Sequence, residues 1–407
     1  MKRIIIIIFF YTISTPFFSN AEHTLNDHDV LVENGEIKKV WYRGNDKSIV
    51  IPSFLDGQTV TSIGLWAFKD VKAKSIHIPN SVTTIRGLAF RYNNLDSLII
   101  PSSVTHIGES AFGGNKIVHI AIPKGLEHIG NYAFTDNKLK SITIPNSVTH
   151  IGDGAFRNNK LSEIALPNSV KHIGDFAFYN NMLNRVTIPN SITHIGAGAF
   201  NKNLIEEINN QLSKGLIYAR DYSGQDKKTT IVSYGGGSKD IDFIPKSVTS
   251  IEKDAFFDVD ITSITFPYNV TRIGESAFAS NKLKSIIIPN SITHIGAMAF
   301  AANELTKINI PNSIVSVEKR AFYNNKIETL TIPNSVQKIE KAAFAKNQLK
   351  SISIPSSVNF IGKAAFLENE LESITLPMEK KWMDSNGKTF TKGKNVVSDL
   401  GLEYKVF

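Results

Sequence analysis

Histidine has the most unusual spacing of the reactive residue types in this sequence. Five histidines recur every 22 residues, and a sixth, His294, stands later in the same His-Ile-Gly context. In a stack of coils, neighbours in this column would lie about 5 Å apart, so that each protonation would disfavour the next. We therefore hypothesise a pH-sensitive column, beside the simpler explanation that one ancestral unit was duplicated. The five are His106, His128, His150, His172 and His194.

Metal binding is a weaker interpretation of the same histidines. Neutral imidazoles bind zinc or copper, but no column of carboxylates accompanies them, and the ligands of a tetrahedral site must converge rather than run parallel. We expect no metal.

Lysine forms a second recurrent column, at the entrance to the strand of each repeat. The positive charge of such a stripe attracts anionic glycans or envelope polymers, and dissolved salt weakens this attraction. Glutamates such as Glu163 and Glu304 interleave with it, so a solvated mixed surface is the alternative. The lysines are Lys116, Lys138, Lys160, Lys282 and Lys326, joined by Lys140, Lys284 and Lys350.

A third set of candidates lies between residues 209 and 244, where the regular spacing is interrupted. Residues 216–219 and 229–234 favour strands, separated by a polar loop at 220–228. We favour a hairpin that replaces one face of a coil. The alternative is a protruding binding loop, because loops on rigid scaffolds often carry function. Its candidate contacts are Tyr218, Arg220, Tyr222 and Tyr234.

Catalysis needs one converging set of groups, and the sequence offers none. Serine, histidine and aspartate recur with the repeat, which yields many equivalent positions. The glycines at 235–237 lack the flanking residues of a phosphate-binding loop. Cysteine is absent, which excludes disulfides, thiolate ligands and a cysteine nucleophile. We expect a non-enzymatic protein with no catalytic residue, no cofactor-binding residue and no cofactor.

The elements that would position these columns follow a 22-residue period. Prolines recur every 22 residues from Pro79 and again from Pro245, and an Ala-Phe pair follows by eleven residues at each of them except the last, Pro377. Periods of 20 to 50 residues indicate solenoids, propellers or arrays. The thirteen phenylalanines are Phe68, Phe90, Phe112, Phe134, Phe156, Phe178, Phe200, Phe256, Phe278, Phe300, Phe322, Phe344 and Phe366.

One unit, residues 139–159, shows the design. Ile142 and Ile144 alternate with polar residues, which predicts a short strand ended by the following proline. Gly152 fits a turn that needs relaxed backbone angles. Asn159 follows Phe156 by three residues, as asparagine does in eleven of the thirteen units, and its amide can bond the backbone of neighbouring coils.

No unit can bury its apolar face alone, so the coils must stack, with strands about 4.8 Å apart. The sequence therefore predicts a leucine-rich-repeat-like, β-rich, right-handed repeat solenoid of about 13 coils with β caps. A hydrophobic fraction of 42% is enough for such a core. The outward strand positions are mostly Ser and Thr, which suits an extended protein surface better than a small molecule.

The pattern Leu-x-x-Ile-x-Ile-Pro-x-Ser-Val-x-x-Ile-Gly-x-x-Ala-Phe-x-x-Asn, which covers about residues 48–377, resembles the BspA-like leucine-rich-repeat family of microbial surface proteins. The resemblance implies adhesion and binding to host proteins or other cells. It does not fix a ligand, because one solenoid scaffold serves many partners.

The amino terminus predicts export. Lys2 and Arg3 precede an apolar run at 4–11, and residues 19–21 end in a small-x-small pattern. This is typical of a secretory signal peptide, with cleavage expected after Ala21 and no transmembrane segment in the mature chain. The net charge is +8, but acidic residues lie among the basic ones and interrupt any continuous basic stripe. We therefore expect no nucleic-acid partner.

These observations divide the chain into six parts: a signal peptide (1–21), an N-terminal cap (22–47), a first repeat block (48–208), the island (209–244), a second block (245–377) and a C-terminal β cap or accessory module (378–407). The functional hypothesis is a secreted or cell-surface protein that mediates adhesion or protein–protein interaction through its solenoid face, with a protein or glycan on a host or neighbouring cell as partner. The alternative is a structural envelope- or glycan-binding protein that uses the lysine stripe.

Overall fold

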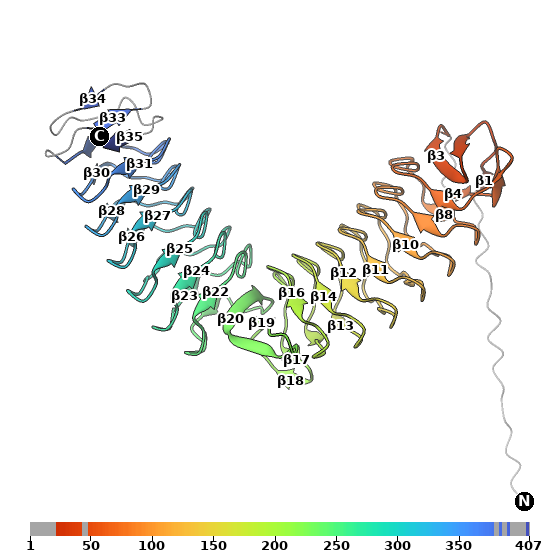
Figure 1. The fold of residues 1–407 in the computed structure, drawn as a ribbon, viewed down its shortest axis with the longest axis horizontal. Helices are drawn as coiled ribbons and strands as arrows, with labels where there is room; N and C mark the ends of the chain where they lie inside the picture. The colour runs from red at the N-terminus through yellow and green to blue at the C-terminus, as the bar shows by residue number, and fades with distance from the viewer. Residues whose placement is uncertain (1–21, 43–47, 378–381, 385–388, 391–403, 407) are drawn as a thin grey trace, which may run out of the picture.

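The computed structural model describes residues 22–42, 48–377, 382–384, 389–390 and 404–406, and the predicted signal peptide therefore lies outside the described residues. The described chain is a β-solenoid of about 15 turns without a helix (Figure 1). The predicted solenoid is confirmed. It has more turns than the thirteen Ala-Phe pairs indicate, because residues 22–42 and the island stack on the coils without carrying such a pair.

The most regular ladder runs through the x-Ile pair before the glycine of each coil. Its strands are parallel and in a register of 22 residues, as in His150↔His172 and Ile151↔Ile173. In the first block these are β7 (Ser62–Ile63), β9 (Thr84–Ile85), β10 (His106–Ile107), β11 (His128–Ile129), β12 (His150–Ile151), β14 (His172–Ile173) and β16 (His194–Ile195). In the second they are β22 (Ser250–Ile251), β24 (Arg272–Ile273), β25 (His294–Ile295), β27 (Ser316–Val317), β29 (Lys338–Ile339) and β31 (Phe360–Ile361).

A second, less continuous ladder runs through the segment before each proline. The strand predicted at Ile142–Ile144 does not form, since residues 141–145 are not assigned to any strand. Where strands form they are β8 (Ser75–His77), β13 (Glu163–Ala165), β15 (Arg185–Thr187), β17 (Glu207–Ile208), β21 (Asp240–Ile241), β23 (Ser263–Ile264), β26 (Lys307–Asn309), β28 (Thr329–Thr331), β30 (Ser351–Ser353) and β32 (Ser373–Thr375).

Both ends of the stack depart from the repeat. At the start, β2 and β3 form an antiparallel pair, and β3 continues into the ladder through β7. At the other end, β35 pairs antiparallel with both β31 and β33. The Asn-Gly pair at 386–387, a sequence signal for a hairpin turn in the expected C-terminal β cap, lies outside the described residues. The end strands are β1 (Glu22–Thr24), β2 (Val30–Glu33), β3 (Glu36–Val40), β4 (Ser48–Val50), β5 (Phe54–Leu55), β6 (Gln58–Thr59), β33 (Trp382–Asp384), β34 (Thr389–Phe390) and β35 (Tyr404–Val406).

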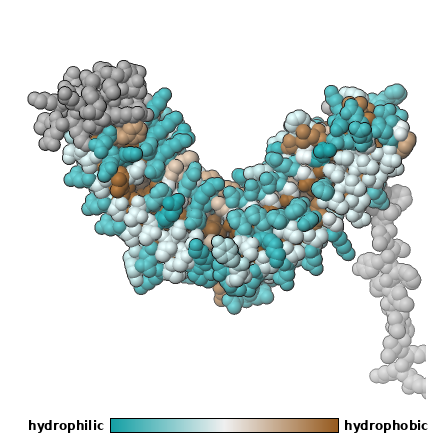
Figure 2. All heavy atoms as spheres, viewed as in Figure 1, coloured by the Kyte–Doolittle hydropathy of each residue, from teal (hydrophilic) through white to brown (hydrophobic). Residues whose placement is uncertain are grey.

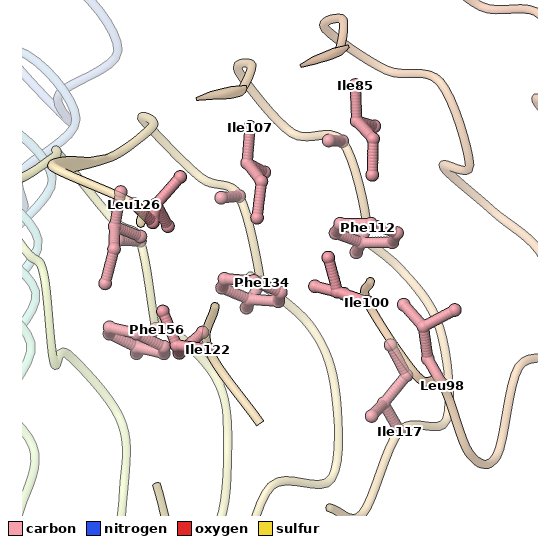
Figure 3. Close-up of a cluster of buried hydrophobic side chains, with 14 of the residues drawn as sticks. Ile85, Leu98, Ile100, Ile107, Phe112, Ile117, Ile122, Leu126, Phe134 and Phe156 are labelled. Atoms are coloured by element: carbon pink, nitrogen blue, oxygen red, sulfur yellow. The ribbon is translucent and has the colours of Figure 1, made fainter. Parts of the chain in front are cut away.

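The phenylalanines of the Ala-Phe pairs form the centre of the core. Within each block, neighbouring rings stack with centroids 5.1–5.7 Å apart. Figure 3 shows Phe112, Phe134 and Phe156 in successive coils, with isoleucines such as Ile107 and Ile122 beside them. Each ring therefore packs on the coil before and the coil after it, as nearest-neighbour stability requires.

The asparagine three residues after each phenylalanine bonds the backbone of adjacent coils, as predicted. Asn159 Oδ1 accepts from Leu139 N at 3.0 Å, and its Nδ2 donates to Phe134 O at 2.9 Å and Phe156 O at 3.1 Å. The side chain is buried. One amide thus bonds buried backbone groups of two coils, and the carbonyls of Phe134 and Phe156 each accept a second bond from a neighbouring asparagine.

The recurrent glycine has a different role from the predicted one. Gly152 has no positive φ. A Cβ on it would lie 2.7 Å from the backbone N of Asn131 in the preceding coil, so the glycine is needed for close approach of the coils. The left-handed conformation occurs two residues later, at Gly154 with φ 55°. Tyr132 occupies the equivalent position one coil earlier with φ 55°, so this turn also accepts residues other than glycine.

Substitution of Asn159 by alanine should destabilise the stack. It would leave the buried N–H of Leu139 without its partner, at about 1–3 kcal/mol, and would remove one of the two amide bonds that the carbonyl of Phe134 accepts. We expect a urea midpoint well below that of the parent, measured by circular dichroism. The matched control is Asn146→Ala, because Asn146 is exposed and should change the midpoint little. Equal effects of both substitutions would contradict this role.

Candidate binding surfaces

The histidine column is an exposed ladder of rings on the x-Ile strands. Ring centroids are 4.7 Å apart for His128 and His150, 5.6 Å for His150 and His172, and 4.3 Å for His172 and His194. His106 pairs in register with Thr84, and its Nδ1 lies 2.9 Å from Thr105 Oγ1. The structure thus brings four of the five histidines into ring contact.

The half-buried member of the ladder, His172, has a lowered pKa. Burial lowers the pKa of His172, and the neighbouring His194 and His150 lower it further, against the opposing effect of Asp153 and Asp175. The four histidines are parallel rather than converging. Among the described residues, no group of three or more His, Cys, Asp or Glu side chains could hold a metal ion.

The lysine column differs between the two arms. Within the described part of the chain, Lys116, Lys138 and Lys160 are exposed and have no carboxylate oxygen within 4.0 Å. In the second arm, Lys282 pairs with Asp260 at 2.7 Å and Lys326 with Glu304 at 3.0 Å. These partners occupy the same column one coil earlier, so these two lysines are neutralised. Among the described residues, Lys284 and Lys350 of the same arm are exposed and have no such ion pair.

The island contains two hairpins rather than one. The first joins β17 to the two-residue strand β18 (Gln211–Leu212). The second joins β19 (Leu216–Arg220) to β20 (Asp226–Tyr234). In Figure 1 they lie where the two arms of the solenoid meet at an angle. Strand β20 also pairs parallel with β22, so the second hairpin takes the place of a coil.

The second hairpin packs between two separate apolar cores. Ile217 and Val232 belong to the core of the first arm, and Tyr218 and Ile231 to that of the second. Alternate residues of a strand point to opposite faces, so one hairpin can seal both cores. This part of the island is structural.

The candidate contacts of the island are mostly buried, which corrects their expected placement. Tyr234 is fully buried, stacks on Phe256 and donates its hydroxyl to Ser238 O. Tyr218 is buried, and Arg220 bonds Gly224 O at 2.8 Å and Asp226 at 3.1 Å. A Cβ on Gly224 would collide with Asn190 O, so the tip lies against the first arm. Tyr222 alone of the four is fully exposed.

Asn201 is a junction residue that sequence reasoning missed. Its buried Oδ1 accepts from Ser233 Oγ at 2.7 Å and Tyr234 N at 3.0 Å, while its Nδ2 donates to Asp254 O at 2.8 Å. One amide therefore joins the first arm, the hairpin and the second arm. The available signal was an amide directly after the phenylalanine, where the other coils carry residues of many types.

Charged groups surround this junction on the side opposite the hairpin. Tyr179 donates its hydroxyl to Asp258, which also pairs with Lys202 at 3.0 Å. Burial raises the pKa of Asp254 to about 6. The two arms are thus held together by polar contacts where the coils meet directly and by apolar packing where the hairpin separates them.

The remaining surface is open rather than enclosed. Four grooves have volumes of about 330–670 Å³. The face seen in Figure 2 is mainly hydrophilic or neutral, with small hydrophobic patches on both arms and at the bend. Exposed apolar residues include Ile99, Leu212 and Ile287. No helix long and apolar enough to span a membrane occurs in the described ranges.

Parallel two-residue ladders, a stacked phenylalanine column and buried asparagines define a leucine-rich-repeat solenoid. The chain matches the BspA type leucine rich repeat region (6 copies) over residues 38–159, 111–228, 239–346 and 271–396. It belongs to this family. A search of curated proteins gives no match.

Several solved structures resemble this chain, including the following two. One is a leucine rich cell surface protein from Faecalibacterium prausnitzii A2-165, with 24% identity, a TM-score of 0.57 and coverage of 87% of each chain. The other is the pneumococcal vaccine antigen PcpA, with 21% identity, a TM-score of 0.51 and coverage of 86% of this chain and 87% of that chain. At these identities the likeness shows the fold.

Acid should weaken the first arm partly through His172. Its pKa in the folded chain lies below the ordinary 6.5, so as the pH falls below that value the unfolded chain takes up a proton more readily than the folded one. Stability is therefore lost with falling pH. We expect His172→Gln to lose less unfolding free energy than the parent between about pH 7.5 and about pH 5.

The measurement is a series of urea unfolding curves across this pH range. His119→Gln is the control, because His119 lies outside the column and should leave the pH dependence as in the parent. Parallel pH profiles for the parent and His172→Gln would refute coupling within the column.

Proposed function

We propose that this chain is a non-enzymatic, exported protein that binds proteins on the surface of other cells through the exposed faces of its solenoid. The observation that carries this proposal is the rigid surface of repeated columns, which runs along both arms and offers open grooves. Such a surface suits a large partner, whereas small-molecule sites are concave and enclosed. Membership of the BspA type family supports it, as does the cell-surface assignment of the F. prausnitzii protein.

Export is supported by the sequence alone. Lys2, Arg3 and the apolar run at 4–11 lead to a small-x-small pattern ending at Ala21, and we propose cleavage there. The mature chain would then begin at Glu22, the first residue of β1.

Within the island, Tyr222 is the candidate for a direct contact. It is fully exposed on a turn whose neighbours are fixed, since Asp221 accepts from Ser223 N at 2.8 Å and Gln225 N at 3.0 Å. A rigid exposed tyrosine supplies contact area at low entropic cost. Tyr218, Arg220 and Tyr234 would act by holding this turn in place.

A second candidate function is binding to anionic polymers of a cell envelope or to glycans. The specific observation in its favour is the unpaired lysine column of Lys116, Lys138 and Lys160, which is one coil apart at each step. Its attraction would be screened by salt.

Cell binding tests the first proposal. Labelled protein comprising residues 22–407 should bind cultured animal cells saturably, and Tyr222→Ala should weaken that binding several-fold because tyrosine is a frequent anchor at interfaces. Flow cytometry gives the affinity. Tyr92→Ala is the control, since Tyr92 is exposed on the first arm, several coils before the island. Absence of saturable binding to cells would sink the proposal. Deletion of the island is unsuitable, because it would open both cores.

Salt and charge reversal test the second function. Reversing Lys116, Lys138 and Lys160 to glutamate should weaken binding to immobilised heparin about a hundredfold or more, at about 1 kcal/mol for each lysine. The control reverses three exposed lysines of the second arm that lie outside the stripe, Lys307, Lys338 and Lys363, with the same change in net charge. Equal losses in both triple variants would show a general charge effect and dismiss the stripe.

A further inference from the structure

The strand ladder before the prolines is interrupted at the bend. It runs from β13 through β15 to β17 and ends with β18, then resumes with β21 and β23. No strand among the described residues fills the interval between β18 and β21. A groove of about 330 Å³ lies there, and its walls come from both sides, including Leu212 and Lys214 on one side and Phe243 and Pro245 on the other.

Strand β18 presents an open edge to this groove. Asn209 and Asn210 have φ of 52° and 60°, as in the tight two-residue turn of a hairpin, which fixes β18 against β17. The next bond in the pair is from Ser213 N to Glu206 O at 2.7 Å. Antiparallel pairs alternate, so the N–H and C=O of Leu212 point away from β17. The Leu212 side chain is 91% exposed.

An exposed apolar edge strand is a template for pairing with another chain, and proteins commonly protect such edges. Here the edge lacks a protecting charge at Leu212 and lies beside a groove floored by buried apolar groups, Leu216 and Tyr218. The arrangement matches the mode in which an extended peptide adds a strand and places alternate side chains into pockets.

The charge of the groove selects among peptides. Lys214 Nζ lies 4.6 Å from the ring centroid of Phe243, and no carboxylate of the described residues pairs with it. The one acid in the lining, Asp226, is engaged by Arg220 at 3.1 Å and by Lys228 at 2.6 Å. The groove therefore has an excess of positive charge.

We propose that this groove binds an extended, acidic segment of a partner protein by strand addition to β18, with alternate apolar side chains on Leu212 and Phe243 and acidic ones beside Lys214. This deepens the proposed function, on which it rests, by assigning the site and the chemistry of the partner segment. It differs from the Tyr222 contact, which lies on the turn of the second hairpin.

The test begins with a phage library of random ten-residue peptides selected on residues 22–407. The enriched peptides should be acidic with apolar residues at alternate positions. Synthetic versions should bind about tenfold more weakly to Leu212→Pro, which removes the N–H that faces the groove, and to Lys214→Glu. Lys284→Glu is the control and should bind as the parent does. N-methylation of the peptide at alternate residues leaves the protein unchanged, so it provides an independent test of strand addition and should also abolish binding.

Other outcomes overturn the inference. These are the absence of enriched peptides, enrichment of basic ones, or binding that is insensitive to both substitutions and to N-methylation. Dimerisation of the chain that Leu212→Pro abolishes would assign the groove to a second copy instead. If Leu212→Pro and Lys214→Glu both leave cell binding intact, the proposed function stands but this groove is not its site. If the groove binds peptides but the protein binds no cells, the groove is a peptide site and the proposed function is wrong.

Discussion

The structure depends on one repeated interaction, the bonding of a buried asparagine amide to the backbone of adjacent coils. Strands of two or three residues cannot satisfy the backbone of a 22-residue coil, and each buried N–H or C=O without a partner is costly. Asn159 and its equivalents supply the missing bonds at the point where the chain enters the core. With the backbone satisfied there, the phenylalanine next to it can stack on its neighbours without leaving polar groups buried beneath it. Burial of the apolar column thus presupposes the amide.

The bend follows from the same requirement. Where the repeat is interrupted, the first arm ends in a coil whose polar groups still need partners. Asn201, Ser233 and the backbone of Tyr234 provide them, and the ring of Tyr234 stacks on Phe256 in place of a phenylalanine. The hairpin β19–β20 separates the arms on one side, while Asn201 and Asp254 keep them in contact on the other. Because the hairpin holds the arms apart on one side and they touch on the other, the two arms meet at an angle, as Figure 1 shows.

The features that could be predicted from the sequence are those that arise from contacts between equivalent residues of adjacent coils. The phenylalanine stack, the asparagine bonds and the family all follow from residues 22 positions apart. Prediction from the sequence was wrong where the role of a residue depends on how closely the coils and the hairpin pack in space. Gly152 was assigned to a relaxed turn because nothing in the pattern reveals that Asn131 N lies where its Cβ would be. Tyr234 was a candidate contact if the island were a protruding loop, yet Ser238 O accepts its hydroxyl and the ring is buried. The first hairpin of the island, β17–β18, does not recur with the 22-residue period, so no repeated pattern predicts it.

Recognition should therefore be sought in departures from the repeat. A column that repeats unchanged offers the same contact many times and cannot set a register for a partner. The lysine column illustrates the point, because it holds three unpaired lysines in the first arm, continues through the exposed Met182 and Leu204 towards the bend, and becomes a series of ion pairs beyond it. The bend is the one place where an open strand edge, an apolar floor and unneutralised positive charge coincide in the described structure. A partner that engages the bend would be fixed in position along both arms, which the uniform faces alone could not achieve.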